Sequence, residues 1–185
     1  MLTYRLNVAG LNRDLPICPV NDTLSIAAFV IFGDVELTVA SSKALLEKAP
    51  PYDYLITAES KGIPLVYEMA RQAGDSNYLL ARKSQKLYMK NVHVVDVQSI
   101  TTTNIQRLYL DGEDFARIKG KRILLVDDVI STGESLRAVE SLVLQAGGTV
   151  AGRMAILAEG DAIQREDIIT LGHLPLFHPD GTVMA

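Results

Sequence analysis

The chain alternates between short apolar runs and stretches in which apolar residues recur at helical spacing. Residues 123–126 form a short, branched apolar run typical of a strand that is buried on both faces. Apolar residues then recur at helical spacing before a Gly-Gly pair, at Leu136, Val139, Leu142 and Ala146. The pattern predicts a strand, a loop and a helix that ends near residue 147.

The same order recurs along most of the chain. Residues 52–57 predict a strand, residues 63–73 a helix and residues 78–83 the next strand. Residues 149–158 predict a further strand, and residues 168–177 predict a terminal strand with an interruption. Strands that alternate with helices through short loops predict an α/β fold with a doubly wound parallel sheet of about five strands.

The start of the chain precedes this pattern. Residues 1–20 alternate loosely and predict a β-hairpin or two short strands, with Pro16 and Pro19 keeping the second strand at a sheet edge. Residues 26–32 have no amphipathic face, which predicts either core or a covering flap. A helix is expected over residues 33–48.

The chain has the size of one domain. Its 185 residues, 48% of them hydrophobic, are ordinary for a single domain, and it contains no internal repeat, low-complexity segment or polar linker. Residues 87–110 are polar and β-prone without a core face, which predicts a β-hairpin arm, and residues 111–119 predict a short helix. We therefore expect a single domain over residues 1–185.

Charge and cysteine content exclude several classes of protein. The net charge is −4 with Lys and Arg scattered along the chain, so no surface for nucleic acid or an acidic membrane is predicted. Cys18 is the only cysteine, which excludes an internal disulfide and fits a reducing compartment. The first residues do not show the basic-then-apolar pattern of a leader, so none is expected, and the longest apolar run falls far short of the roughly 20 residues that span a membrane. We expect a cytoplasmic protein.

Candidate chemistry begins in the loop that follows the strand over residues 123–126. The loop consists of Ser131, Thr132, Gly133, Glu134 and Ser135. A glycine flanked by hydroxyl residues at a helix start offers free backbone N–H groups, a helix dipole and side-chain donors, which suit a phosphate dianion. The segment is not a Walker loop, because no Gly-Lys-Ser/Thr follows the glycine.

Asp127 and Asp128 precede this loop at the end of the strand. Carboxylates repel a phosphate, so two of them beside it are useful if the same ligand also presents hydroxyl groups or a divalent cation. A phosphorylated sugar meets that condition. Each residue alone would also suit an ordinary turn or helix cap, so the prediction depends on the whole set.

Two other predicted strands end in polar residues. One is followed by Glu59, Ser60, Lys61 and Gly62, and the other delivers Arg82 and Lys83, with Lys86 just beyond. The carboxyl ends of parallel strands meet at one edge of a sheet, where ligands bind in open α/β folds. An Arg fork and a Lys point charge suit an anionic group such as a diphosphate.

Residues 126–135 resemble the phosphoribosyl-pyrophosphate motif of the type I phosphoribosyltransferases, and the resemblance extends over residues 52–177 as the core of the fold. It implies that Asp127 and Asp128 bind the ribose hydroxyls and Mg²⁺, with or without an intervening water, and that residues 131–135 bind the 5′-phosphate. It also implies that residues 59–62 hold the pyrophosphate. Residues 81–86 resemble the Arg-Lys segment of the adenine and xanthine branch.

The implied reaction is displacement of pyrophosphate from phosphoribosyl pyrophosphate by a purine base, giving a nucleoside monophosphate in purine salvage. A cationic ribosyl transition state forms beside an anionic leaving group, so the protein positions the substrates and compensates charge. The implied catalytic residues are Asp127, Asp128, Arg82 and Lys83. The arm occupies the place of the loop that closes over the substrates in this family.

The preferred base stays open. The hypoxanthine-guanine branch usually has an Asp just before the Thr-Gly of the motif, where this chain has Ser131. Adenine enzymes often carry a Glu in the arm, but residues 99–104 contain none. We expect adenine first, with xanthine or hypoxanthine and guanine as the alternatives.

The family covers its base with a subdomain outside the sheet, which implies a small N-terminal hood over residues 1–33, with the C-terminal tail as a further contributor. The alternative, extra strands that extend the parallel sheet, stays open. The candidate base-binding residues are Phe29 or Phe32 for stacking, Val129 and Ile130 for the opposite wall, and Glu159 as an acceptor for an exocyclic amine.

Two further expectations concern assembly and use. We expect a homodimer, because residues 82–86 and the arm are too exposed to be held by one small chain, and the enzymes it resembles pair. A second function also stays open, a non-catalytic regulator that senses phosphoribosyl pyrophosphate. Neither a helix-turn-helix extension nor a basic face is visible in the sequence to support it.

Overall fold

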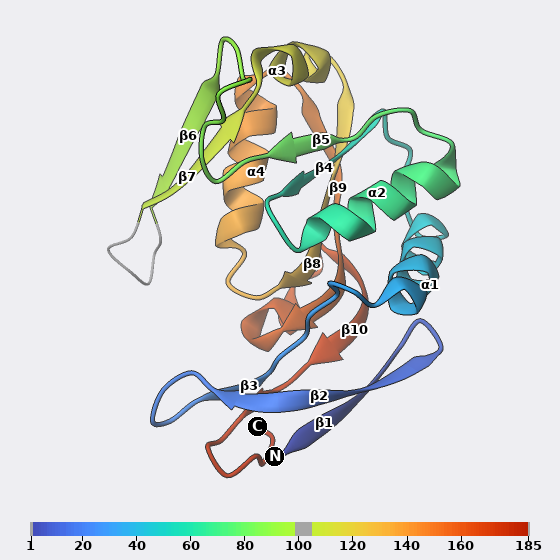
Figure 1. The fold of residues 1–185 in the computed structure, drawn as a ribbon, viewed down its shortest axis with the longest axis vertical. Coiled ribbons are helices and arrows are strands. Elements are labelled where there is room, and N and C mark those ends of the chain that lie inside the picture. The colour runs from blue at the N-terminus through green and yellow to red at the C-terminus, as the bar shows by residue number, and fades with distance from the viewer. Residues whose placement is uncertain (1, 99–104, 185) are drawn as a thin grey trace.

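A five-stranded parallel sheet lies at the centre of the computed structural model, which describes residues 2–98 and 105–184 (Figure 1). The strand order is β10-β9-β8-β4-β5. The strands are β4 (Tyr54–Ala58), β5 (Leu79–Ala81), β8 (Arg122–Ile130), β9 (Thr149–Glu159) and β10 (Ile169–Leu174). Every neighbouring pair is parallel, which confirms the expected sheet.

Helices cover both faces of this sheet, as expected for a doubly wound fold. The helices are α1 (Val35–Leu46), α2 (Gly62–Ala73), α3 (Gly112–Ile118) and α4 (Glu134–Gln145), and a 3₁₀ turn, η1 (Gly160–Gln164), follows β9. The buried residues of α1 and α2 form one core cluster with the sheet, and those of α3 and α4 form a second cluster. No helix in the described part of the chain is long and apolar enough to cross a membrane.

A separate antiparallel sheet lies below the parallel sheet in Figure 1. Its order is β1 (Thr3–Val8), β2 (Leu11–Pro19), β3 (Ser25–Ala27) and β11 (Leu176–Phe177). The opening strands therefore do not extend the parallel sheet, and the C-terminal segment contributes a strand of its own. Both ends of the chain build this antiparallel sheet.

The expectation that prolines keep β2 at an edge is wrong, because β2 lies between β1 and β3. Pro16 faces Thr3 in the last pair between β1 and β2, and Pro19 is the final residue of β2. A proline at the end of a ladder removes no interior hydrogen bond, so the strand can be central.

The expected arm is the two-stranded hairpin of β6 (His93–Gln98) and β7 (Ile105–Leu110). The arm does have a core face, contrary to expectation. Val95, Leu108 and Leu110 are buried in the same cluster as α4, so its base is packed against the body of the protein. The residues between its strands, 99–104, lie outside the described part of the chain, so the closing-loop prediction stays a prediction.

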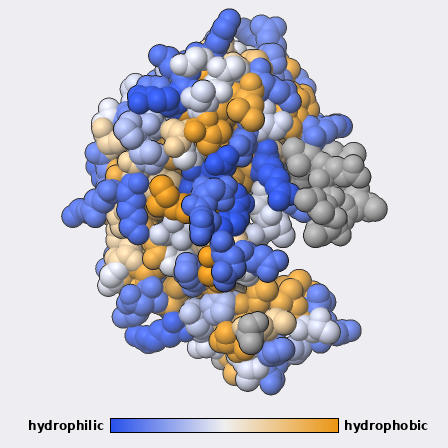
Figure 2. Space-filling model, turned by 180° about the vertical axis from the view of Figure 1, so that it is seen from behind, coloured by the Kyte–Doolittle hydropathy of each residue, from blue (hydrophilic) through white to orange (hydrophobic). Residues whose placement is uncertain are grey.

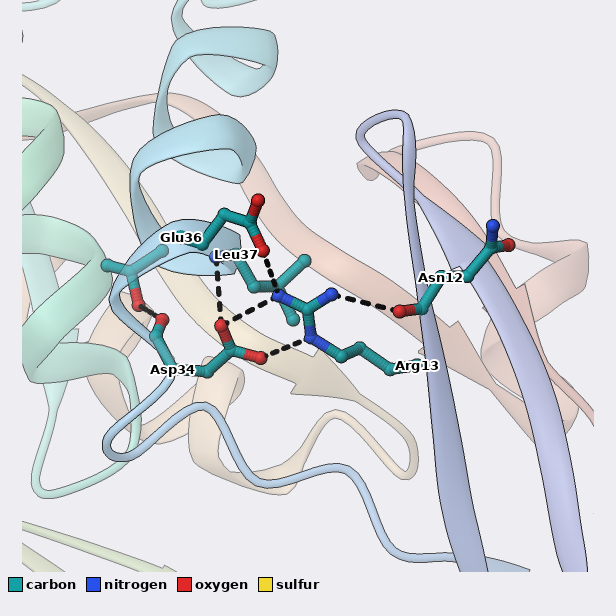
Figure 3. Close-up of polar contacts among 6 residues, drawn as sticks. Asn12, Arg13, Asp34, Glu36 and Leu37 are labelled. Atoms are coloured by element: carbon teal, nitrogen blue, oxygen red, sulfur yellow. Dashed lines mark hydrogen bonds and ion pairs between the residues drawn. The ribbon is translucent and has the colours of Figure 1, made fainter.

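An ion-pair cluster connects the antiparallel sheet to α1 (Figure 3). Arg13 of β2 binds Asp34 through Nε–Oδ2 and Nη2–Oδ1 contacts of 2.6 and 2.9 Å, and its Nη2 donates to Glu36 at 2.9 Å. Asp34 also caps α1, because its Oδ1 accepts from the backbone N–H of Leu37 at 3.0 Å. The Arg13 hydrogen bond lowers the pKa of Asp34. This cluster fixes the antiparallel sheet against the first helix of the core.

Candidate functional site

The ends of β4 and β8 meet the loops that follow β4, β5 and β8 at the carboxyl edge of the parallel sheet, where such folds bind ligands. Together they enclose a cavity of about 210 Å³. Its lining consists of Ala58, Glu59, Ser60, Lys61, Lys83, Asp127, Asp128, Val129 and Ser135. Eight of these nine residues are predicted site residues, all but Ala58. The fold thus brings together residues separated by up to 77 positions in the sequence.

The two carboxylates at the end of β8 are held close together. Asp128 is only 3% exposed, and its Oδ2 lies 3.0 Å from Lys61 Nζ, an ion contact without hydrogen-bond geometry. Asp127 is partly buried, and its Oδ1 accepts from the backbone N–H of Asp128 at 2.9 Å. Burial, and then the charge of Asp128, raise the pKa of Asp127. One lysine faces two carboxyl groups, so the pair can take a hydroxyl donor or a cation.

Glu59 connects the loop after β4 to the end of β5. Its Oε2 accepts from the backbone N–H of Lys83 at 3.0 Å, and its Oε1 lies 3.3 Å from Arg82 Nη2. The Glu59–Ser60 peptide bond is cis. Since the Glu59 carboxylate is occupied by these contacts, it positions the Arg-Lys segment beside the cavity.

The three predicted cations lie in different surroundings. Lys83 is exposed and lines the cavity. Arg82 pairs through its main chain with Tyr109 of β7, with two N–H···O distances of 2.8 Å, and directs its guanidinium to Glu59. Lys86 Nζ donates to Ser84 Oγ at 2.7 Å and does not line this cavity. Of the three, Lys83 is placed to meet a ligand there.

The 131–135 loop leads into α4 and borders a second cavity, of about 610 Å³. Gly133 is the N-cap residue of α4 with a left-handed φ of 75°. The second cavity is lined by Ser131, Thr132, Glu134, Arg137, Asp161, Ala162, Arg165 and Asp167. Arg137 and Arg165 were not among the site residues predicted from the sequence. The only hint in the sequence was that each arginine lies near the end of an element, Arg137 near the start of α4 and Arg165 just after η1. Residues 165–167 by themselves resemble an ordinary solvated turn.

The structure separates the predicted base-binding residues. Phe29 is 5% exposed within the core cluster of α1 and α2, so the expectation that its ring stacks on a base is wrong. Ile130 is also wrongly assigned, because it is 2% exposed in the opposite cluster. β8 continues to Ile130 instead of ending at Val126, so Val129 and Ile130 point to opposite faces.

The remaining candidates lie nearer to open space. Val129 lines the first cavity, and Phe32 is 49% exposed. Glu159 is the last residue of β9. Burial raises the pKa of its carboxyl group, the charge of Lys61 lowers that pKa, and the charge of Asp128 raises it. Figure 2 shows the surface hollowed between the antiparallel sheet, at the bottom, and the body of the molecule.

Known proteins resemble this chain in both sequence and fold. The family profile of the phosphoribosyl transferase domain matches residues 41–170. A hypoxanthine/guanine phosphoribosyltransferase of Methanotorris igneus is 33% identical over 109 residues, 59% of this chain and 55% of the relative. Its counterpart in Methanohalophilus mahii is 30% identical over 113 residues, 61% of this chain and 55% of the relative. The chain spans a little over half the length of these curated relatives.

The solved structures that share this fold are named for adenine, whereas the curated relatives are named for hypoxanthine and guanine. The adenine phosphoribosyltransferase of Thermoanaerobacter pseudethanolicus superimposes with a TM-score of 0.71 at 19% identity, over 86% of this chain and 95% of that one. The Giardia lamblia enzyme bound to 9-deazaadenine has a TM-score of 0.64 at 19% identity, over 93% of both chains. At such identities the likeness concerns the fold alone.

Proposed function

The chain belongs to the phosphoribosyl transferase domain family, and we propose that it transfers the 5-phosphoribosyl group from phosphoribosyl pyrophosphate to a purine base. The observation that carries this proposal is the first cavity, of about 210 Å³, at the carboxyl edge of the sheet. Its lining brings together two adjacent carboxylates, two lysines and the hydroxyl of Ser135. These groups suit a ligand that presents hydroxyls and phosphates together.

Each part of the substrate has a matching part of the site. The 131–135 loop binds the 5′-phosphate through backbone N–H groups at the start of α4. Asp127 and Asp128 accept from the ribose hydroxyls, and Lys83 with the 59–62 loop binds the pyrophosphate. The residues thereby hold the sugar between a base and an anionic leaving group while charge develops on the ribose.

Asp127 and Asp128 fit a bound Mg²⁺. Hard cations take oxygen ligands, and Mg²⁺ is usually bound through one or two carboxylates together with water and substrate phosphates. The Oδ2 atom of Asp128 is buried and lacks a hydrogen-bond donor, and the described residues contain no group of three or more His, Cys, Asp or Glu side chains that would form a complete cage. When bound, Mg²⁺ would neutralise charge on the diphosphate.

Adenine is the base we propose first. Val129 offers an apolar wall, and Phe32 remains available for stacking. Glu159 supplies an acceptor for an exocyclic amine at the end of β9, whereas Ser131 stands where the hypoxanthine-guanine branch usually has an Asp. Hypoxanthine, guanine and xanthine are the competing bases, and the curated relatives are named for the first two.

A base panel tests this proposal. The protein is incubated with phosphoribosyl pyrophosphate, Mg²⁺ and one of adenine, hypoxanthine, guanine, xanthine, uracil or orotate, and nucleoside monophosphate is measured by chromatography. We expect adenine to react fastest and the pyrimidines not to react. Turnover of orotate or uracil alone would overturn the purine assignment. Binding of phosphoribosyl pyrophosphate without turnover of any base would favour a sensing regulator.

We also propose that the antiparallel sheet covers the base.

We propose further that the enzyme is a homodimer. Leu87 and Tyr88 follow the Arg-Lys segment and are exposed, Tyr88 to 67%. Two large exposed apolar side chains next to the Arg-Lys segment in the sequence suit burial by a second copy. Light scattering at assay concentration should give twice the chain mass of 20.2 kDa, and a monomer would refute the dimer.

A further inference from the structure

A series of ion pairs lies outside the first cavity and ends at the 131–135 loop. Arg153 of β9 binds Glu140 of α4 with an Nε–Oε2 distance of 3.1 Å, and its Nη1 lies 3.8 Å from Asp167 Oδ2. Asp167 in turn binds Arg165 through Nε–Oδ1 and Nη2–Oδ2 contacts of 2.9 and 2.7 Å. The series joins α4, β9 and the segment before β10.

The last member of the series contacts the loop. A Cβ atom added to Gly133 would lie 2.7 Å from Arg165 Nη1, so the guanidinium lies directly against the α-carbon of this glycine. The other two nitrogens of Arg165 donate to Asp167, which holds the planar group in one orientation. Gly133 has a left-handed φ of 75° where α4 begins, so the guanidinium supports the loop where its backbone turns into the helix.

The guanidinium of Arg165 also contributes to the balance of charge in the second cavity. The cavity is lined by two guanidinium groups, Arg137 and Arg165, and by three carboxylates. Loss of Arg165 would leave three carboxylates and one cation beside a loop that must accept a phosphate dianion. The side chain of Arg137 lines the same cavity but has no hydrogen-bond or ion-pair partner among the described residues. Its contact with Gly133 is the helix hydrogen bond from its backbone N–H to the Gly133 carbonyl at 3.0 Å, which does not depend on the side chain.

We propose that Arg165 is a positioning residue for the 5′-phosphate. Held by Asp167, it fixes Gly133 in the conformation in which the N–H groups of the 131–135 loop converge, and it offsets the neighbouring carboxylates. This inference rests on the proposed function, because it assigns the 5′-phosphate to that loop. Arg165 acts through the loop, and the diphosphate end of the substrate does not depend on it.

Ribose 5-phosphate and inorganic pyrophosphate separate the two ends of the substrate. Calorimetric titrations would compare the wild type with Arg165→Gln, Arg165→Lys and Arg137→Gln. We expect Arg165→Gln and Arg165→Lys to bind ribose 5-phosphate about tenfold more weakly, as small misplacements of binding groups do. Pyrophosphate binding should stay within about twofold, because its contacts belong to the other cavity. Arg137→Gln, which removes the same charge, should cause a clearly smaller loss.

The double variant Arg165→Gln with Asp167→Asn separates positioning from charge. It removes one cation and one anion together, so it restores the net charge of the cavity without restoring the support of Gly133. We expect ribose 5-phosphate binding to stay weak, and KM for phosphoribosyl pyrophosphate to rise while KM for the base is unchanged. Thermal unfolding of each variant establishes that the fold is retained.

Several outcomes would overturn the inference. Wild-type affinity in Arg165→Lys or in the double variant would reduce the role of Arg165 to net charge. Equal losses in Arg137→Gln and Arg165→Gln would do the same, and equal weakening of pyrophosphate would show a general structural defect. A wild-type protein that binds neither ribose 5-phosphate nor phosphoribosyl pyrophosphate would refute the proposed function itself, and this inference with it.

Discussion

Gly62 is the first residue of α2, and alanine at this position should distort the loop proposed to hold the pyrophosphate. An added Cβ atom would lie 2.1 Å from Thr57 Oγ1, 3.2 Å from Thr57 Cβ and 3.4 Å from Asp127 Oδ1. Real Cβ atoms essentially never approach another atom within 3.0 Å. The first contact is thus too short by about 0.9 Å, and either the loop or β4 must move.

The magnitude follows from the burial of the clashing group. Thr57 is 1% exposed on β4, so rotation of its side chain would push its methyl group into packed neighbours. Forcing an extra carbon into a packed site typically lowers the free energy of unfolding by about 1–3 kcal/mol. A shift of about 1 Å in a binding loop can reduce activity by roughly a hundredfold. We expect Gly62→Ala to lose stability and to bind pyrophosphate at least about tenfold more weakly.

Substitutions at Thr57 supply matched controls. Thr57→Ala removes the clashing hydroxyl, whereas Thr57→Val puts a methyl group at its position. In urea unfolding, Gly62→Ala combined with Thr57→Ala should show a favourable coupling of about 1 kcal/mol or more, and the combination with Thr57→Val should show almost none. Pyrophosphate titration should follow the same order.

Wild-type stability and normal pyrophosphate binding in Gly62→Ala would refute this prediction, because the loop would then absorb the added carbon at no cost. Rescue of the variant by Thr57→Val as complete as that by Thr57→Ala would refute it too. That result would mean that the contact between the two residues is not the source of the loss.

Three further predictions concern the site and its support. Lys83→Ala should weaken pyrophosphate binding about tenfold or more, because it removes one charge-assisted contact. Lys86 does not line the cavity, so Lys86→Ala should cause a smaller loss in the same titration. Asp34→Ala should unfold in urea with about 1 kcal/mol less stability than Asp34→Asn, because asparagine keeps the N-cap acceptor; equal losses would contradict the cap. Asp127→Asn combined with Asp128→Asn should abolish turnover and keep the circular-dichroism spectrum of the folded protein; loss of that spectrum would assign the pair to stability instead.

Local patterns in the sequence were enough to predict the parallel fold. Strand and helix periods are set by neighbouring residues, so the order of elements from β4 to β10 could be predicted without knowledge of their partners. The convergence of the 59–62 loop, Lys83 and the Asp127–Asp128 pair also followed, because parallel strands present their carboxyl ends at one edge. The chemistry proposed for the cavity depends mainly on these short segments.

Only the tertiary structure decided which side chains are available to a ligand. Phe29 and Ile130 are apolar residues in segments next to the site, and nothing in their local sequence distinguishes a buried ring or branch from one that lines a cavity. Their burial depends on which elements stack over them. The pairing of β11 with β3 likewise joins segments from opposite ends of the chain. Arg165 reaches Gly133 because β9 and α4 are neighbours in space, a contact between residues 32 positions apart that no periodicity predicts.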